Sequence, residues 1–497
     1  MHASVEKLRT LIAEVMDLRH SADLIEWDER VYMPPGGVTV HGEMSAALRR
    51  LAHEKFTSDG VGTALDAARA DVAGDDPDST AARMVAVVAR DYARATRVPA
   101  DFVAEHAAAI SAAQHVWAEA RSKSDFAAFA PHLQTVIDLK RRYVSFFPPE
   151  EHPYDVLLDD YEPGMKTAAV KRLFDSLRQR QVAIIKSVAD RPAPAAEFLS
   201  ARYAESDIWR FAVDVVTAFG FDWTRGRQDK SVHPFATGIG ASDVRITTRW
   251  VEGQPLALLF GTMHEAGHAM YEQGVGDEHQ RTLLEGGASL GVHESQSRLW
   301  ENMVGRSRAF WNHFFPRLQA ACPDQLASVS AAAFYAAINR VRPTLIRVEA
   351  DEATYNLHIM LRVELELALI EGSLRVSDLP DAWNARMQEY LGLTPPDDAS
   401  GVLQDIHWSA GLFGYFATYT LGNLIAAQLW ERFGQLHPAR DAEIGRGDFS
   451  ALLSWLRSEL HRHGRKFEPQ VLVERVTGSP VSPEPYLRYL EEKYAAR

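Results

Sequence analysis

Two histidines separated by one helical turn are the residues of this sequence best suited to chemistry. They are His264 and His268 in the segment MHEAGHA, and Glu265 directly follows the first of them, which gives the pattern HExxH. On a helix, residues four apart share a face, so both imidazoles could bind one tetrahedral metal ion while Glu265 flanks the water that the ion carries. The alternative is a helix with two ordinary histidines, because short patterns also arise by chance.

The sequence around this pattern supplies a helix and a third ligand. A helix is expected between Pro255, which suits a first turn, and Gly274, which suits a helix end. Glu294 in VHESQSR follows His268 after 25 intervening residues, which is enough chain to turn and return on a second helix. Two histidines and one glutamate leave the fourth position of zinc open, as in catalytic rather than structural sites.

Other polar residues nearby leave part of the ligand set open. Glu272 could orient a histidine from behind or face solvent, and Glu285 is a further competing ligand. His279 lies between acidic residues in a segment that we interpret as a solvated turn. His293 could touch substrate or simply pack against its neighbours.

The same region contains a serine-hydrolase pattern. Gly287, Ser289 and Gly291 satisfy G-x-S-x-G, in which a nucleophilic serine lies between a buried strand and a helix. The preceding segment QRTLLEGGA predicts no such strand. We therefore interpret this part of the chain as a metal site and not as a serine site.

A mostly helical chain would have to position these residues. Apolar residues recur at three- and four-residue spacing, for example from Val5 to Val15 and from Leu133 to Phe147, and residues 355–370 are apolar on most sides. The one clear strand pattern runs from Val244 to Val251. Because no flexible linker interrupts the chain, we predict a single, mainly α domain over residues 1–497 with a small β-sheet.

Composition excludes several functional classes. The 497 residues include 53 basic and 67 acidic side chains, and the resulting net charge of -14 disfavours binding to nucleic acid or to anionic membranes. The single cysteine, Cys322, excludes an intrachain disulfide, and the charged first twenty residues do not resemble a secretory signal, so a cytoplasmic location is predicted. Residues 406–430 lack charged side chains, but their glycines and polar groups favour a buried helix over a membrane span.

Several distinctive blocks occur in order along nearly the whole chain. They are LIEWDERVYMPPGG from Leu24, HPF at His233 to Phe235, DxRxT at Asp243, Arg245 and Thr247, HExxH at His264 to His268, HESQ at His293 to Gln296, IRVEAD with Ile346, Arg347, Ala350 and Asp351, and GVLQDIHW with Gly401, Gln404, Asp405, His407 and Trp408. Together they resemble the motifs of the carboxypeptidase Taq family of thermostable zinc metallocarboxypeptidases. No motif position departs from that pattern, which argues against an inactive homologue.

The resemblance implies both a fold and an activity. It implies a gluzincin-type HExxH helix at the floor of a deep, helix-built groove, with the third metal ligand supplied by the block that contains Glu294. It also implies an enzyme that removes residues one at a time from free peptide C-termini, uses Zn²⁺ with Co²⁺ or Mn²⁺ as substitutes, and forms cytoplasmic homodimers.

A mechanism can be assigned to individual residues. Zinc held by the three ligands would make its water more acidic, and Glu265 would take the proton and later deliver it to the leaving amine. The developing oxyanion needs a second donor, for which His407, Tyr415 and Tyr419 are the candidates. Either tyrosine could instead be a packing residue whose hydroxyl bonds locally.

Recognition of a free carboxylate requires a fixed cation in a chain of this net charge. We predict that Arg347 grips the carboxylate in a bidentate manner. The alternative is a structural ion pair with a neighbouring acid, namely Glu349, Asp351 or Glu352. Arg245 is the alternate anchor, His233 in the HPF block is a further substrate-binding candidate, and the exposed edge of the strand that carries Arg245 could hold the peptide backbone.

Two other functions compete with this prediction. A zinc oligopeptidase that cuts internal or penultimate bonds would share HExxH and a distant glutamate on a helical fold. A peptide-binding protein that retains the metal without turnover would share the same ligands.

Overall fold

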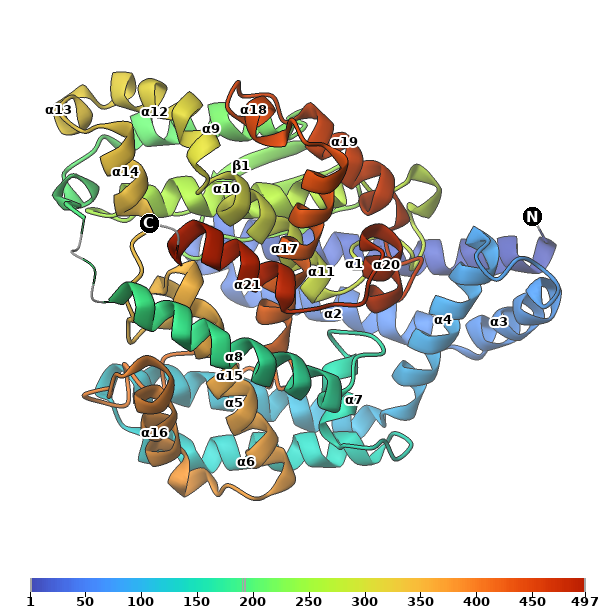
Figure 1. Cartoon of the computed structure of the whole chain (residues 1–497). Helices are drawn as coiled ribbons and strands as arrows, with labels where there is room; N and C mark the ends of the chain where they lie inside the picture. The colour runs from blue at the N-terminus through green and yellow to red at the C-terminus, as the bar shows by residue number, and fades with distance from the viewer. Residues whose placement is uncertain (1, 190, 192–193, 496–497) are drawn as a thin grey trace. The chain divides into compact units, whose positions relative to one another are not determined.

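The computed structural model describes residues 2–189, 191 and 194–495, and Figure 1 shows helices along most of this length. The chain divides into two compact units. Unit 1 comprises Met1–Thr96, Pro194–Ile338 and Leu429–Ser479, and unit 2 comprises Arg97–Ala193, Asn339–Gln428 and Pro480–Arg497. The single domain over residues 1–497 stays a prediction.

Unit 1 combines helices with a small sheet. Its helices are α1 (Ala3–Val31), α2 (Val38–Phe56), α3 (Asp59–Val72), α4 (Thr80–Arg97), α9 (Glu205–Phe219), α10 (Pro255–Glu272), α11 (Leu290–Arg298), α12 (Arg308–Ala321), α13 (Pro323–Leu326), α14 (Ala331–Ile338), α18 (Arg440–Ile444), α19 (Ser450–Glu459) and α20 (Pro469–Thr477). Its strands are β1 (Gly226–Lys230), β2 (Ala236–Gly238) and β3 (Val244–Thr248). A π-helical segment, Leu299–Val304, directly continues α11.

Unit 2 is helical throughout its regular elements in the described part of the chain. These are α5 (Ala100–Lys123), α6 (Phe126–Ser145), α7 (Tyr154–Asp159), α8 (Thr167–Ala189), α15 (Glu352–Glu371), α16 (Leu379–Leu391), α21 (Glu484–Leu490) and the first part of α17 (Ala417–Leu436). With the three-stranded sheet of unit 1, this confirms the predicted fold class, which is mainly α with a small β element. The deep groove stays a prediction.

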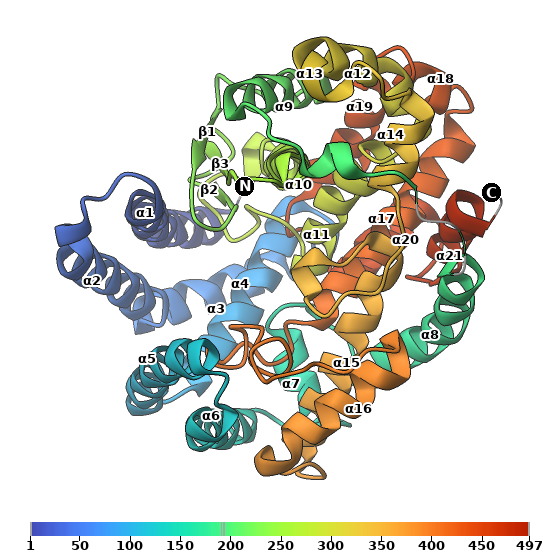
Figure 2. The ribbon, with the colours of Figure 1, turned by 90° about the vertical axis from the view of Figure 1, so that its left-hand side faces the viewer.

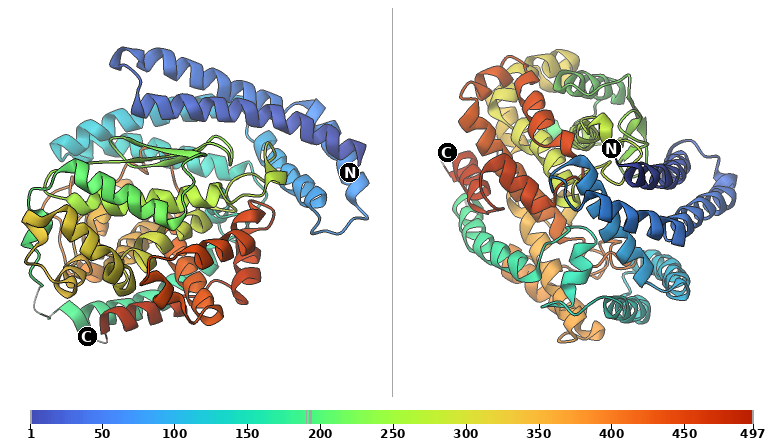
Figure 3. Two further views of the ribbon diagram at one scale, coloured as in Figure 1. Left: turned by 90° about the horizontal axis from the view of Figure 1, so that it is seen from above. Right: turned by 90° about the vertical axis from the view of Figure 1, so that its right-hand side faces the viewer.

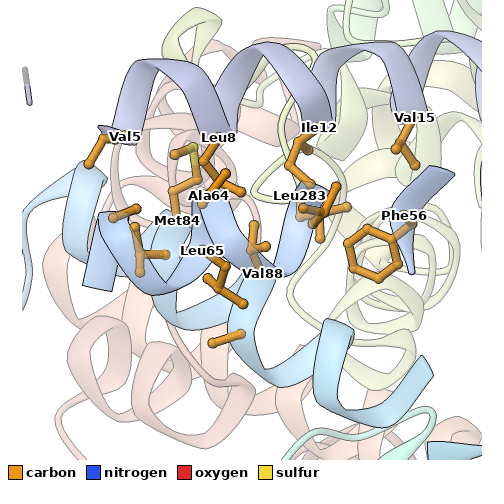
Figure 4. Packing of buried hydrophobic residues seen from close by; sticks show 14 of the residues in the cluster. Val5, Leu8, Ile12, Val15, Phe56, Ala64, Leu65, Met84, Val88 and Leu283 are labelled. Carbon is orange, nitrogen blue, oxygen red and sulfur yellow. The ribbon is translucent and has the colours of Figure 1, made fainter. Parts of the chain in front are cut away.

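The apolar spacing at the start of the chain produces the packing that it predicts. Helices α1 and α2 run antiparallel beside each other (Figure 3). The side chains of Val5, Leu8, Ile12 and Val15 are at most 1% exposed and pack in the cluster of Figure 4, to which α2, α3 and α4 also contribute. Burial of one apolar stripe therefore fixes the face that α1 turns inward.

The sheet differs from its prediction in one respect that bears on function. Its strand order is β1-β3-β2, with β1 parallel and β2 antiparallel to β3, and it lies beside α10 (Figure 2). The predicted strand is β3, which ends at Thr248 rather than Val251. Because β3 is the central strand, the prediction that its edge is free to bind a peptide backbone is wrong, and the edges belong to β1 and β2. Those strands, GRQDK and ATG, have little intrinsic strand preference, which is why the sequence did not reveal them.

Two apolar segments are buried as the sequence predicts. Helix α15 is buried on most sides and ends at Gly372, whose φ of 82° is the left-handed conformation that glycine adopts without strain. Asp351 caps its first turn by accepting from the backbone N–H groups of Ala353 and Thr354. Residues 406–430 are mostly buried as predicted, but α17 begins only at Ala417, so the predicted helix is wrong for residues 406–416. Within the described residues, no helix combines the length and the apolar character needed to cross a bilayer.

Candidate active site

Helix α10 presents the two histidines of the HExxH pattern on one face. It begins at Pro255 and ends at Glu272, close to the predicted limits, and the imidazole centroids of His264 and His268 lie 4.9 Å apart. A Cβ on Gly267 would lie 2.6 Å from the backbone oxygen of Gln296. Only glycine therefore lets α11 approach α10 so closely at this point.

Helix α11 brings the third predicted ligand to this face. It begins after Ser289, whose side chain accepts from the backbone N–H of Val292 at 3.1 Å. Glu294 Oε2 then lies 3.6 Å from His264 Nε2 and 3.5 Å from His268 Nε2. Ligand atoms bound tetrahedrally at about 2.0–2.2 Å from a zinc ion are about 3.3–3.6 Å apart, so this donor set fits such an ion.

The grouping of these ligands is specific within the described part of the chain. One candidate atom from each of His264, His268 and Glu294 lies within 4.8 Å of the other two, and no second group of three such side chains converges in this way among the described residues. The competing ligand Glu285 instead lies 3.7 Å from His20 Nε2. His279 is only 1% exposed, so its interpretation as a solvated turn residue is wrong; its ring is buried beside the distant segment that contains Arg462.

Two further side chains, which the sequence analysis missed, hold the ligands in place. Arg298 Nε donates to Glu294 Oε1 at 2.6 Å, which leaves Oε2 directed at the histidines. Glu301 Oε2 lies 2.9 Å from His264 Nδ1 and 3.4 Å from Arg298 Nη1. Partners of this kind orient a metal ligand and tune its basicity. Glu294, Arg298 and Glu301 recur at intervals of four and three residues, and this spacing was the available signal.

The electrostatics of the ligands favour a bound cation. Burial lowers the pKa of His268 to about 3, so its imidazole is neutral and has a lone pair to donate. Burial opposes ionisation of Glu294, but Arg298 and the histidines together hold its pKa well below the usual range. The pKa of His264 is raised because Glu294 and Glu301 outweigh the effect of burial. The cluster therefore stabilises positive charge at its centre.

Glu265 has the properties of a group that exchanges a proton. Its side chain is only 7% exposed. Burial raises the pKa of Glu265 to about 7, an effect that His264 opposes and that the neighbouring Glu294 and Glu301 reinforce. A carboxyl with a pKa near neutrality can both accept and release a proton at pH 7.

In unit 2, the predicted carboxylate anchor lies in a buried charged cluster. Arg347 is 7% exposed, and its Nε and Nη2 lie 2.9 and 2.8 Å from Asp405 Oδ1, while Nη1 donates to the Tyr355 hydroxyl at 2.9 Å. Arg362 is fully buried and its Nε donates to the other oxygen of Asp405 at 2.7 Å. The ion-pair partner of Arg347 is thus Asp405, which is 58 residues away in the sequence. The structural alternative, an ion pair with the nearby Glu349, Asp351 or Glu352, is not what the structure shows.

The oxyanion candidates of unit 2 lie next to this cluster. His407 is 7% exposed, its Nε2 lies 3.2 Å from the Tyr419 hydroxyl, and its ring centroid is 5.4 Å from that of Tyr415. Burial lowers the pKa of His407 to about 3, so this ring is neutral. The guanidinium of Arg347 lies 5.1 Å from the Tyr419 ring centroid. The structure therefore brings His407, Tyr419 and Arg347 together.

The two remaining substrate-binding candidates have different environments in unit 1. Arg245 donates to both oxygens of Asp243, at 2.9 and 2.7 Å, and its guanidinium lies 4.3 Å from the Trp27 ring centroid. His233 is exposed, and its backbone oxygen accepts from the Ser231 hydroxyl. Arg245 thus already has a carboxylate partner, whereas the His233 ring faces solvent.

Comparison with known proteins places the chain in a family. The sequence model of the carboxypeptidase Taq (M32) metallopeptidases matches residues 7–494. The chain belongs to this family. It is a metallocarboxypeptidase, and the match favours that activity over the oligopeptidase alternative.

Similar proteins span the full length of this M32 family member. It is 43% identical to thermostable carboxypeptidase 1 of Thermus thermophilus, with 99% of each chain covered, and 35% identical to carboxypeptidase 1 of Bacillus subtilis, with 100% of this chain and 99% of the other covered. A crystal structure of an M32 carboxypeptidase from Deinococcus radiodurans superposes with a TM-score of 0.97 at 41% identity, covering 100% of this chain and 99% of the other. The resemblance inferred from the motifs is confirmed.

Proposed function

We propose that this M32 metallocarboxypeptidase releases single amino acids from free peptide C-termini, with His264, His268 and Glu294 holding the metal and Glu265 transferring protons. One observation carries the proposal: the three ligand atoms converge within 4.8 Å, and the adjacent carboxyl of Glu265 is buried. A bound divalent ion would supply Lewis acidity, which polarises a carbonyl and makes water acidic enough to ionise near pH 7.

Glu265 performs the proton transfers in this proposal. In its ionised form it accepts a proton from the attacking water, and burial then stabilises the neutral carboxyl that results. The protonated carboxyl returns the proton to the leaving amine, which restores the ionised form. A pKa of about 7 suits both steps at neutral pH.

The charge of the buried cluster in unit 2 supports carboxylate recognition by Arg347. Two guanidiniums, those of Arg347 and Arg362, share the single carboxylate of Asp405. One buried positive charge is therefore left without an acidic partner inside this trio, which is the complement of a free C-terminal carboxylate. Arg362 and Asp405 also fix the guanidinium plane of Arg347, so that less side-chain entropy is lost on binding.

His407 and Tyr419 are the proposed donors to the developing oxyanion. Both side chains have N–H or O–H groups within a mostly buried polar cluster, where hydrogen bonds are stronger than in water. No hydrogen-bond partner for His407 Nδ1 is found among the described residues, so this neutral ring retains a free nitrogen. Tyr415, which precedes α17 and whose ring centroid lies 5.4 Å from that of Tyr419, is the alternative donor.

Product analysis tests the proposed exopeptidase activity. The protein is incubated with a blocked dipeptide and with the same peptide carrying a C-terminal amide. We expect release of one free amino acid from the first and none from the second, because the amide has no charge for Arg347 to bind. Equal cleavage of both peptides would contradict the proposal, as would full activity after exhaustive chelation of the metal.

Three finer properties belong to the same proposal. Zinc is the proposed ion, with cobalt or manganese as substitutes, because a set of two histidines and one carboxylate suits zinc. Metal analysis of the purified protein tests this, together with activity after chelation and readdition of each ion. A cytoplasmic location and a homodimer are proposed from the family resemblance, and light scattering during size-exclusion chromatography measures the oligomeric state.

A further inference from the structure

A chain of hydrogen bonds runs outward from the metal ligand His268. His268 Nδ1 lies 2.7 Å from His293 Nδ1, and His293 Nε2 lies 2.6 Å from Glu272 Oε1. Glu272 is one turn beyond His268 on α10, and His293 directly precedes Glu294 on α11. The chain therefore joins the helix that carries two metal ligands to the helix that carries the third.

A single arrangement of protons satisfies this chain when His268 Nε2 donates its lone pair to a metal. The proton of the neutral His268 ring must then lie on Nδ1, which donates to His293 Nδ1. Because His293 Nδ1 accepts, the proton of that ring lies on Nε2 and is donated to the Glu272 carboxylate. Each side chain in this way fixes the tautomer and the orientation of the one before it.

The backbone around His293 is shaped to its ring. A Cβ on Gly287 would lie 2.7 Å from His293 Cδ2 and 2.8 Å from Tyr271 Cε1, so only glycine allows the loop before α11 to press against both rings. The Tyr271 and His293 ring centroids are 5.1 Å apart, and the Tyr271 hydroxyl accepts from the backbone N–H of Ala288 at 3.1 Å. Packing thus restrains the His293 ring before any metal binds.

These contacts also explain the serine-hydrolase pattern of the sequence. Gly287 leaves room for the His293 ring, and the Ser289 hydroxyl caps α11. Neither residue needs a nucleophilic role to account for its place. The segment is instead the support of the histidine behind the metal ligand.

We propose that His293 and Glu272 are positioning residues that hold His268 in the tautomer and orientation required for metal binding, and thereby set the affinity for the metal. This inference rests on the proposed metal site. The two ligand histidines would be supported differently, since His264 contacts the carboxylate of Glu301 directly, whereas His268 reaches the carboxylate of Glu272 through a second imidazole.

The test compares two substitutions of His293 in the full-length apoprotein. His293→Phe keeps an aromatic ring but removes both nitrogens, whereas His293→Gln supplies an acceptor and a donor at a separation close to that of the imidazole nitrogens. The dissociation constant for Zn²⁺ is measured by competition with a chromophoric chelator, without substrate. We expect His293→Phe to bind Zn²⁺ about 10- to 100-fold more weakly than the parent, and His293→Gln to recover most of the loss.

A spectroscopic readout and a matched control separate this role from general packing. The visible absorption of the Co²⁺-loaded protein should change in His293→Phe and be largely restored in His293→Gln, because it reports the geometry of the ligands. Tyr271→Phe removes a buried hydrogen bond beside the His293 ring, but it leaves the hydrogen bonds from His268 through His293 to Glu272 intact. We expect that control to lose stability without any change in Zn²⁺ affinity.

The outcomes distinguish this inference from the proposed function. Unchanged Zn²⁺ affinity in His293→Phe, or equal losses in the Phe and Gln variants, would overturn the positioning role. If His293→Phe does not fold, Glu272→Leu takes its place, with an expected loss of about 10-fold, and unchanged affinity there would overturn the role equally. A parent protein that binds no metal would instead contradict the proposed function itself.

Discussion

The metal centre of unit 1 and the arginine cluster of unit 2 are both buried, but lone pairs converge in the first whereas positive charge is in surplus in the second. At the metal centre, ligand atoms of His264, His268 and Glu294 lie within 4.8 Å of one another. Arg298 and Arg306 pair with Glu294 and Glu301 there, so these two acids are already balanced. In unit 2, Arg347 and Arg362 face the single acid Asp405, and burial, reinforced by the two guanidiniums, lowers the pKa of His407. A buried surplus of charge costs free energy unless a ligand of opposite sign offsets it. One region is therefore suited to a cation and the other to an anion.

The largest effect is expected at the metal centre, from Glu265→Gln. The amide occupies the same space but cannot accept the proton of the attacking water, so kcat should fall about 10³- to 10⁴-fold. Metal content should match the parent, because Glu265 is not among the converging ligands. Steady-state kinetics and metal analysis measure the two quantities, and a variant that kept a tenth of the parental kcat would remove Glu265 from its role.

The next effect concerns stability and tests the surplus of buried positive charge in unit 2. Asp405→Asn keeps the shape of the side chain but leaves two buried guanidiniums without an acid, so the free energy of unfolding should fall by about 3–5 kcal/mol. Urea denaturation measures this change. The matched control is Asp243→Asn, where the acid is 41% exposed beside Arg245 and a loss within about 1 kcal/mol is expected. Similar losses of stability in both variants would show that Asp405 contributes no more than the acid of an exposed ion pair does.

Glu366 sharpens the comparison, because this buried acid is satisfied by hydrogen bonds. It accepts from the Tyr154 hydroxyl at 2.5 Å, Trp408 Nε1 at 2.9 Å and the Gly414 backbone N–H at 3.0 Å, and burial raises its pKa to about 7. The folded protein keeps this proton up to about pH 7, whereas the unfolded chain releases it near pH 4.5. The contribution of Glu366 to the free energy of unfolding is thus fully present below pH 4.5 and falls by about 3 kcal/mol as the pH rises to 7.

The measurement is the free energy of unfolding of the parent and of Glu366→Gln between pH 4.5 and pH 7.5. Glutamine does not titrate. The difference in unfolding free energy between parent and variant should therefore change by about 3 kcal/mol over this pH range, even if the variant is less stable at every pH. A difference that does not vary with pH would show that Glu366 is already ionised at pH 4.5.

The smallest effect separates the two tyrosines of unit 2. Tyr419→Phe removes the hydroxyl that lies 3.2 Å from His407 Nε2, and one hydrogen bond lost in the transition state should lower kcat about 10-fold with little change in KM. Tyr415→Phe is the matched control, because the two ring centroids are 5.4 Å apart, and a smaller effect is expected from it. The reverse order of effects would assign the oxyanion contact to Tyr415.

The sequence predicted those parts of the site that depend on local geometry. His264 and His268 share a face because the pitch of a helix puts residues four apart on the same side. The same periodicity predicted the buried stripe of α1 and the enclosed helix α15, and the left-handed Gly372 ended the latter where expected. Strand β3 was found for a similar local reason, although its neighbours β1 and β2 were not.

Contacts between distant segments were the part that single-sequence patterns did not reveal. Asp405 as the shared partner of Arg347 and Arg362, Arg298 as the clamp on Glu294, and the chain from His268 through His293 to Glu272 all depend on which helices pack together. Two predictions were wrong for the same reason: that the edge of β3 is free and that His279 is solvated. The surroundings of β3 and of His279 are formed by other segments of the chain.

By itself, the sequence determined the helical class, the ligand pair on α10 and the family to which the chain belongs, since these follow from residue spacing and from blocks of motif. Tertiary structure alone decided where Glu294 points, which acid Arg347 and Arg362 share, and which side chains hydrogen-bond to the outer nitrogens of the ligand histidines. The physical reason is that helix pitch acts over a few residues, whereas buried charges and hydrogen bonds are satisfied by whichever groups the packing of the core brings near.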